Sequence, residues 1–177
     1  GLDLAAEGPM QKGDDNSYLF NYRYSTVGLL GQLGVSFGDE QIHFQDLSFH
    51  LNMKGKKGGQ YAVFGMGGLS ENVFRHKEDT AEIKYDKERY DIDFLSKTGI
   101  LGGSGKWKLD SRSWLKAVLI YSVQTNDWHK INAFELDSIG LDKRTEERMA
   151  ASLEWHYNWQ QHQFSAGVQA SRIYFEG

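Results

Sequence analysis

The most regular feature of the sequence is an alternation of apolar and polar residues that recurs along most of the chain. In Ser17–Ser25 an aromatic residue occupies every second position, and mostly polar residues fill the positions between. Asp46–Met53, Arg148–Trp159 and Phe164–Ser171 repeat the pattern. Successive side chains of a β-strand point to opposite faces, so a period of two residues predicts strands with one apolar and one polar face.

These four segments predict which residues share the apolar face. They are Tyr18, Phe20, Tyr22, Tyr24, Leu47, Phe49, Leu51, Met53, Met149, Ala151, Leu153, Trp155, Tyr157, Trp159, Phe164, Ala166, Val168 and Ala170. Weaker patterns at 2–10, 60–69, 90–105 and 115–122 bring the expected total to about eight strands. The pattern does not assign faces at 60–69 or 95–109.

The connections between the predicted strands are short and long in turn. Short ones fall at 11–16, 54–59, 110–113 and 160–162, and long, polar ones of about 18 to 21 residues fall at 26–43, 71–88 and 125–145. Transmembrane β-barrels have this alternation, with short periplasmic turns and long extracellular loops. Within the first long connection, Val27–Leu33 could form one helical turn packed on the barrel rim.

Aromatic residues gather beside the short connections. Trp107 and Trp114 flank one, Trp155 to Phe164 flank another, and Tyr61 follows a third. Trp and Tyr favour the membrane interface because their rings have an apolar and a wet end. We therefore expect a periplasmic aromatic girdle and an all-β fold: an antiparallel up-and-down transmembrane β-barrel segment over residues 1–177.

Composition agrees with this fold and excludes several functions. Proline occurs once, glycine 20 times, and aromatics make up 14% of the residues, as suits strands and turns. The absence of cysteine excludes disulfides and thiolate sites, and a net charge of -4 does not suggest a nucleic-acid binder. The six histidines form no HExxH pattern, and the clustered glycines do not open a helix, so we expect neither a metal site, a cofactor nor an enzyme.

Three stretches of the chain carry a family resemblance. They are NYRYSTVGLLGQLG (Asn21–Gly34), FQDLSFHLNMKGKKGGQYAVFGMGGLS (Phe44–Ser70) and YDIDFLSKTGILGG (Tyr90–Gly103). They resemble early barrel strands of TonB-dependent outer-membrane receptors of the Bacteroidetes type, whose members often carry a carboxypeptidase-regulatory-like domain. The resemblance is strongest from Leu4 to about Trp128 and says nothing of the substrate.

The resemblance implies a nutrient import receptor of the cell outer membrane. Such receptors have a 22-stranded barrel, a plug and a TonB box, and this chain contains neither plug nor box. Because the chain begins and stops in strand-like sequence, ending Phe175-Glu176-Gly177, we expect it to be a piece of a larger barrel. Its partners would be outer-membrane lipid, the plug and later strands, TonB through the plug, and a small ligand.

Two alternatives remain open. Eight strands can close a small autonomous barrel with a structural or adhesive role. A soluble ligand-binding β-barrel would also alternate, with its apolar face inward.

Two groups of residues are candidates for function. Possible ligand contacts lie in the segments 38–43, 75–82 and 127–137, above all His43, Arg75, His76, Glu78, Asp79, Asp127, Trp128 and His129. Possible lumen-lining residues lie on the predicted polar faces: Arg23, Asp46, His50, Asp91, Asp93, Arg148, Glu154 and His156.

Overall fold

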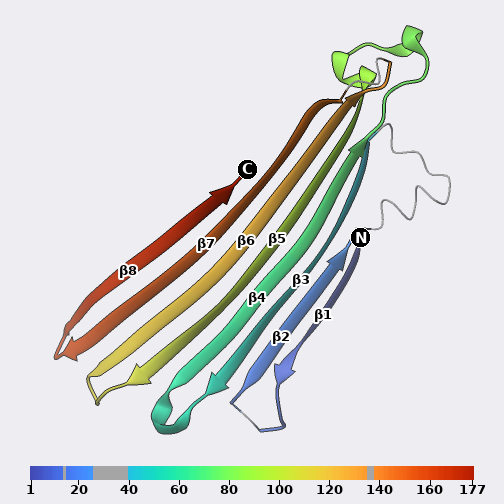
Figure 1. Ribbon diagram of the computed structural model, residues 1–177. Coiled ribbons are helices and arrows are strands. Elements are labelled where there is room, and N and C mark those ends of the chain that lie inside the picture. The colour runs from blue at the N-terminus through green and yellow to red at the C-terminus, as the bar shows by residue number, and fades with distance from the viewer. Residues whose placement is uncertain (14, 26–39, 135–137) are drawn as a thin grey trace.

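The protein is all-β, with eight antiparallel strands in one meander sheet (Figure 1). The computed structural model describes residues 1–13, 15–25, 40–134 and 138–177. The predicted helical turn at Val27–Leu33 and residues 38–39 of the segment 38–43 lie outside the described residues. The strands are β1 (Leu2–Pro9), β2 (Ser17–Tyr24), β3 (Glu40–Lys54), β4 (Gln60–Phe74), β5 (Tyr90–Lys108), β6 (Ser113–Asn132), β7 (Ser138–Trp159) and β8 (His162–Glu176).

Each strand pairs with its neighbours in the sequence, and the described residues of β1 and β8 form the two edges of an open sheet. The small closed barrel, one of the alternatives above, would need β1 to pair with β8, and the described strands make no such ladder. Pro9 lies in the edge strand, where its missing N–H removes no interior ladder bond.

The four odd-numbered connections of the meander lie at one end of the sheet and the three even-numbered ones at the other, and the two ends differ. At the turn end, β3 and β4 are joined through η1 (Lys56–Gly58), where Lys57 and Gly58 adopt positive φ angles of 60° and 77°. At the loop end, β4 and β5 are joined by fifteen residues that include η2 (Thr80–Glu82) and η3 (Asp86–Arg89). No helix in the described part of the chain is long and apolar enough to cross a membrane.

The prediction of a third long connection, at 125–145, is wrong. β6 continues to Asn132 and β7 starts at Ser138, so only residues 133–137 join them. The ladder pairs Thr125 with Thr145 on one face and Asn126 with Arg144 on the other, so polar residues lie on both faces. A strand that is polar on both faces has no alternation to detect, although its backbone hydrogen bonds continue.

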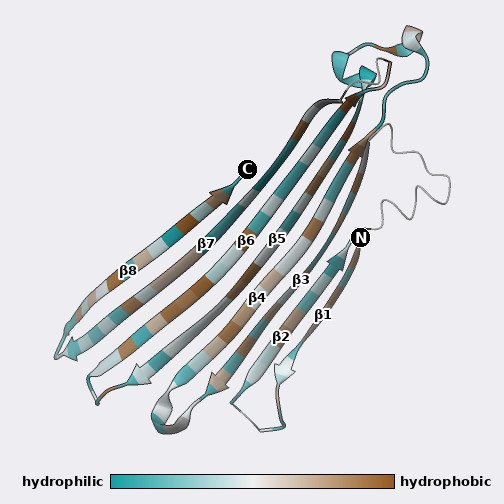
Figure 2. Cartoon of the chain, in the orientation of Figure 1, coloured by the Kyte–Doolittle hydropathy of each residue, from teal (hydrophilic) through white to brown (hydrophobic). Residues whose placement is uncertain are grey.

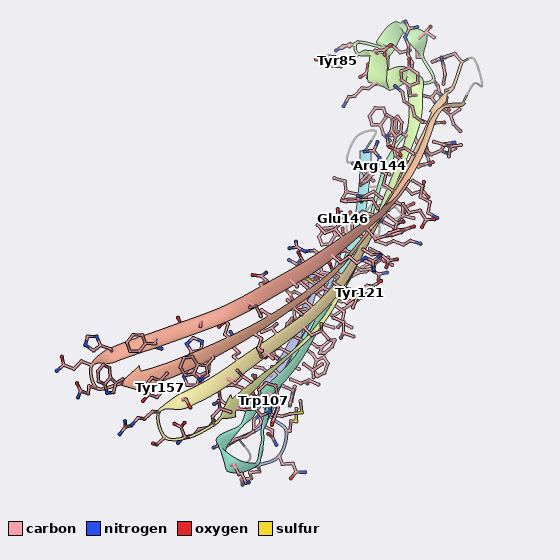
Figure 3. The ribbon with its side chains drawn as sticks, turned by 60° about the vertical axis from the view of Figure 1, so that its left-hand side comes forward. Tyr85, Trp107, Tyr121, Arg144, Glu146 and Tyr157 are labelled. Atoms are coloured by element: carbon pink, nitrogen blue, oxygen red, sulfur yellow. The ribbon has the colours of Figure 1, made fainter. Side chains whose placement is uncertain are left out.

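The sheet is a single layer, and none of its described apolar side chains is buried. Figure 3 turns the sheet toward its edge and shows side chains projecting from it without a second layer against either face. Packing within a face is therefore between neighbours on adjacent strands. The ring of Phe49 lies over Gly65 on one face, and the ring of Phe64 lies over Gly102 on the other.

We predict that Gly65→Ala destabilises the sheet whereas Gly67→Ala does not. A Cβ at position 65 would lie 2.5 Å from the Phe49 ring and 3.1 Å from the Ile100 carbonyl oxygen, so the ring must move. A Cβ at position 67, two residues along the same face, would meet nothing closer than 3.8 Å. Denaturant titration of the folded protein should show a loss of about 1–3 kcal/mol for Gly65→Ala only. Equal midpoints for the two variants would contradict the packing of Phe49 on Gly65.

Candidate functional site: the two faces and the loop end

The ladder registers assign every strand to two faces. Phe20, Phe49, Gly65, Leu101, Tyr121 and Met149 are successive partners, so they share the face named here the apolar face. Arg23 and Asp46 are partners on the opposite face, named the polar face. All the residues predicted to share the apolar stripe lie on the apolar face. The same registers resolve 60–69 and 95–109, placing Val63, Leu69, Leu101 and Trp107 on the apolar face.

The apolar face is open across all eight strands. Leu119 on β6 is 57% exposed, and Val168 on β8 is 72% exposed. Soluble monomers rarely expose a continuous apolar patch of more than a few hundred Å². This face therefore requires a cover that the described chain does not itself provide.

Aromatic residues border the apolar face at the turn end. Tyr61 packs edge-on against Trp107 with ring centroids 5.9 Å apart, and Trp155 stacks on Tyr157 at 5.7 Å. Figure 3 shows Trp107 and Tyr157 toward this end of the sheet. Trp114 does not join them: it pairs with His156 on the polar face, with ring centroids 3.6 Å apart. An edge of aromatic residues is thus present at the turn end of this face, and Trp114 is not part of it.

Charged residues border the apolar face toward the loop end. The first charged residues met on this face from the turn end are Glu71 on β4, Lys97 on β5, Asp127 on β6, Glu147 on β7 and Arg172 on β8. Figure 2 shows the same change as hydrophilic colour toward the loop end of β6 and β7.

The apolar band between these borders has the same length on three of the strands. On β4 it runs from Tyr61 to Glu71, on β5 from Trp107 to Lys97, and on β7 from Tyr157 to Glu147. Each pair is ten residues apart, which is about 33 Å along a strand.

The band crosses the strands obliquely. The ladder partner of Arg172, followed from β8 to β4, is Gly65, which lies six residues before Glu71. Between β4 and β8 the charged border thus shifts by about 20 Å along the strands. The four strand spacings between them amount to about 19 Å, so the border is inclined by about 45° to the ladder rows. Followed through the ladder from β4 to β8, the row of Tyr61 reaches Val168, which lies four residues after Phe164. The aromatic border is therefore inclined by about 35° to the ladder rows.

The polar face carries most of the residues predicted to line a lumen. Arg23 donates two hydrogen bonds to the Asp46 carboxylate, at 3.0 and 2.9 Å. His156 lies 3.3 Å from Glu154 and stacks on Trp114, and the Lys106 ammonium lies 4.1 Å from the centre of that Trp114 ring. His50 and Arg148 belong to the same face.

Asp91 and Asp93 do not lie on the polar face, and the prediction that groups them with Arg23 is wrong. Asp93 pairs with Val73 and His129, so it continues the apolar face beyond its charged border. The apolar residues Tyr90, Ile92 and Phe94 take the polar-face positions instead. The alternation in this segment is inverted relative to the rest of the sheet, and only the register reveals it.

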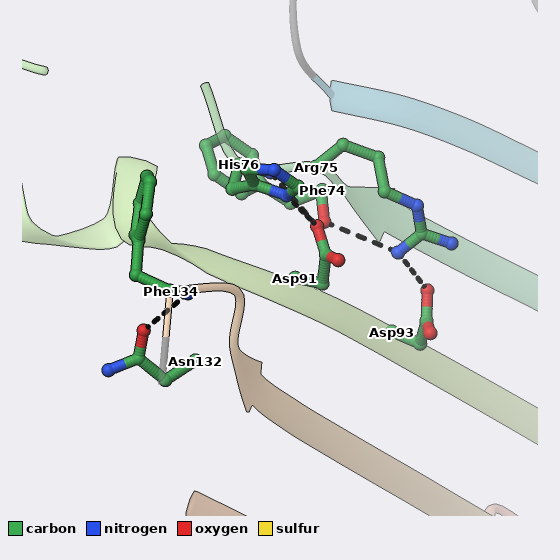
Figure 4. A network of polar contacts seen from close by, with 7 residues as sticks. All are labelled: Phe74, Arg75, His76, Asp91, Asp93, Asn132 and Phe134. Atoms are coloured by element: carbon green, nitrogen blue, oxygen red, sulfur yellow. Dashed lines mark hydrogen bonds and ion pairs between the residues drawn. The ribbon is translucent and has the colours of Figure 1, made fainter. Parts of the chain in front are cut away.

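The two aspartates anchor the β4–β5 connection at the loop end (Figure 4). Arg75 Nη1 lies 2.7 Å from Asp93 Oδ1. The Asp91 carboxylate accepts the backbone N–H of His76 at 3.0 Å and also contacts His76 Nδ1 at 2.9 Å. Phe134, from the β6–β7 connection, packs edge-on against the His76 ring with centroids 5.9 Å apart. The network therefore joins two connections at this end of the sheet.

The predicted ligand-contact residues do not form one group. Arg75, His76, Glu78 and Asp79 lie in the β4–β5 connection, as expected. His43 lies in β3, and Asp127, Trp128 and His129 lie in β6, so their placement in loops is wrong. Asp127 and His129 share one face, whereas Trp128 lies on the other. The Trp128 ring covers Gly140 so closely that a Cβ at position 140 would lie 2.6 Å from it.

Glu88 organises the β4–β5 connection and was not a candidate from the sequence. It is only 7% exposed, accepts the backbone N–H groups of Tyr85 and Lys84, and pairs with Lys77 at 3.3 Å. These hydrogen bonds to Tyr85 and Lys84 hold the pKa of Glu88 below its ordinary value. In the sequence it is one acidic residue among several, and no pattern marks it.

Among the described residues, no group of three His, Asp or Glu side chains gathers as metal ligands would. No protein-family model matches the chain, and no curated protein matches it.

We predict that the β4–β5 connection loosens when acid protonates Glu88. Because the native pKa is lowered, the carboxylate stabilises the connection above the ordinary value of 4.5, and this stabilisation is lost as the pH falls through the native pKa. Protease cleavage within 77–88 should accelerate in that acid range.

Glu88→Gln should be cleaved rapidly already at neutral pH and show little of this acid dependence, because a neutral amide oxygen accepts the two backbone N–H groups more weakly than a carboxylate does and makes no ion pair with Lys77. Glu82→Gln, in the same connection, is the matched control and should behave as wild type. Unchanged cleavage of Glu88→Gln at neutral pH would contradict the assigned role.

Proposed function

We propose that the chain forms part of the wall of a transmembrane β-barrel in the outer membrane, with its apolar face toward lipid and its polar face toward the lumen. The observation that carries this proposal is the apolar band, which has constant length on β4, β5 and β7 and is inclined across the strands by about 35–45°.

A lipid bilayer accounts for both properties of the band. Transmembrane strands tilt by about 35–45°, and the apolar belt of such barrels is about 25 Å tall. A band of about 33 Å along a strand tilted by about 40° stands about 25 Å tall, which is that height. A flat slab cutting tilted strands also requires the borders to shift across the sheet, and between β4 and β8 the charged border shifts by six residues and the aromatic border by four.

The aromatic border supports the same orientation. Tyr61, Trp107 and Tyr157 each lie ten residues from a charged residue on the same strand and face. Trp and Tyr collect at both membrane interfaces, where the ring can be half in lipid and half in water. The turn end would then be periplasmic and the loop end extracellular.

The polar face suits a wet lumen, and the open sheet suits a wall of a larger barrel. The Arg23–Asp46 pair is partly exposed to solvent, and the Lys106 ammonium lies over the Trp114 ring that stacks on His156, so charged groups occupy this face. The edges β1 and β8 present unpaired backbone groups, which lipid cannot satisfy, so further strands must pair with them in the membrane.

The resemblance to TonB-dependent receptors then gives the biological role that we propose: import of a nutrient, with energy delivered through TonB to a plug outside this chain. The role is transport and not catalysis. The β4–β5 connection, anchored by Asp91 and Asp93, would be an extracellular loop available to a ligand.

Two neighbouring arginine substitutions on β8 test the orientation. Val168 lies midway between Phe164 and Arg172 on the apolar face, and Gln169 lies on the polar face. In membranes, Val168→Arg should lose about 2–4 kcal/mol of folding free energy, because it places a charge near the bilayer midplane. Gln169→Arg should lose less than about 1 kcal/mol.

The measurement is a denaturant titration of the two variants, each made in the complete barrel that contains this chain and refolded into lipid vesicles. In a soluble barrel with its apolar face inward the protein would fold in buffer without vesicles. Folding without lipid, or equal stability of the two variants in lipid, would contradict the proposed orientation.

A further inference from the structure

The apolar face is hollowed near its charged border. A shallow hollow of about 560 Å³ lies where Gly67 of β4 and Gly99 of β5 are ladder partners. Neither glycine has a side chain to fill the space, and Leu47, Leu69 and Val123 form its apolar walls. A Cβ built on Gly99 would be 3.5 Å from Val123, so the hollow could hold a larger side chain without a clash.

One cation borders this hollow. Tyr22 Oη donates to Gln45 Oε1 at 3.2 Å, and Thr125 shares a hydrogen bond with Thr145 at 3.3 Å, so these polar rim residues already have partners. Lys97 is exposed, and the ion pairs found among the described residues do not include it.

Asp46 also borders the hollow, but it cannot neutralise Lys97. Its carboxylate binds Arg23 through two hydrogen bonds, and its side chain belongs to the polar face. The charge available to a ligand in the hollow is therefore positive.

We propose that this hollow binds one anionic membrane lipid, with an acyl chain along Gly67 and Gly99 and the headgroup phosphate on Lys97. The inference rests on the proposed function, since it requires the apolar face to meet lipid. Lys97 lies at the end of the ten-residue band, at the depth where headgroups begin, and an ammonium there extends toward the interface. An acyl chain fits the apolar walls, and the phosphate complements the unpaired cation.

A second hollow on the same face provides an internal comparison. It has a volume of about 670 Å³, and its lining includes Gly103, Gly105 and Ala117 beside Trp107. It has no charged residue in its lining. A chain bound there would show no preference for an anionic headgroup.

The test uses the protein embedded in nanodiscs of phosphatidylcholine with a minority of phosphatidylglycerol, followed by native mass spectrometry of the lipids that remain bound. Wild type should retain phosphatidylglycerol in preference to phosphatidylcholine. Lys97→Gln should lower that preference about fivefold, which is the effect of one basic residue near an anionic surface.

Gly99→Leu, which fills the hollow, should remove the retained lipid, and Gly103→Leu in the second hollow should leave the preference unchanged. Protease resistance in nanodiscs shows that each variant is folded. Retention of phosphatidylglycerol by folded Lys97→Gln or Gly99→Leu at the wild-type level overturns the lipid site but leaves the proposed function standing. Failure of the complete wild-type barrel that contains this chain to insert into nanodiscs overturns the proposed function and the lipid site together.

Discussion

The structure depends on one constraint: a band of apolar side chains crosses the strands on one face of the sheet, and no described part of the chain covers it. The backbone ladder holds the sheet together, but it does not remove apolar surface from water. A domain of this length ordinarily gains most of its stability from a buried core, and the described residues here form none. The environment of the apolar face must therefore provide what a core provides elsewhere.

The shape of the apolar surface supports the proposed membrane environment more than its size does. Between β4 and β8 the charged border shifts by six residues and the aromatic border by four, so the band as a whole is oblique to the ladder rows. In the proposed orientation the aromatic residues at one border and the charged residues at the other would lie at the two interfaces of the bilayer.

Part of this organisation could be predicted from the sequence, because it is local. The faces of β2, β3, β7 and β8 follow from alternation within each segment. The face of Asp91 and Asp93 could not be predicted, because it is set by pairing across β4 and β6, and Tyr90, Ile92 and Phe94 invert the local pattern. The same holds for Trp114, whose partner His156 is distant in the sequence.

The length of β6 and β7 could not be predicted from the sequence, for a different reason. Beyond the charged border both faces meet water in the proposed orientation, so polarity no longer distinguishes them. The candidate ligand residues Asp127, Trp128 and His129 consequently lie on a strand, with side chains divided between its faces. Loop positions such as Arg75 and His76 could be anticipated, but their anchoring by Asp91, Asp93 and Phe134 depends on contacts between strands.

The most direct test of the central claim is the depth of labelled positions in a bilayer. A fluorophore attached to cysteine at Leu69, Leu101 or Leu153, each in a separate variant, would be quenched by lipids brominated at known depths. Leu101 and Leu153 lie near the middle of the band on β5 and β7, and Leu69 lies beside its border on β4. We predict deep and equal positions for Leu101 and Leu153, which belong to different ladder rows, and a shallow position for Leu69. Depths that follow the ladder rows instead, or no quenching by lipid, would contradict a tilted transmembrane sheet.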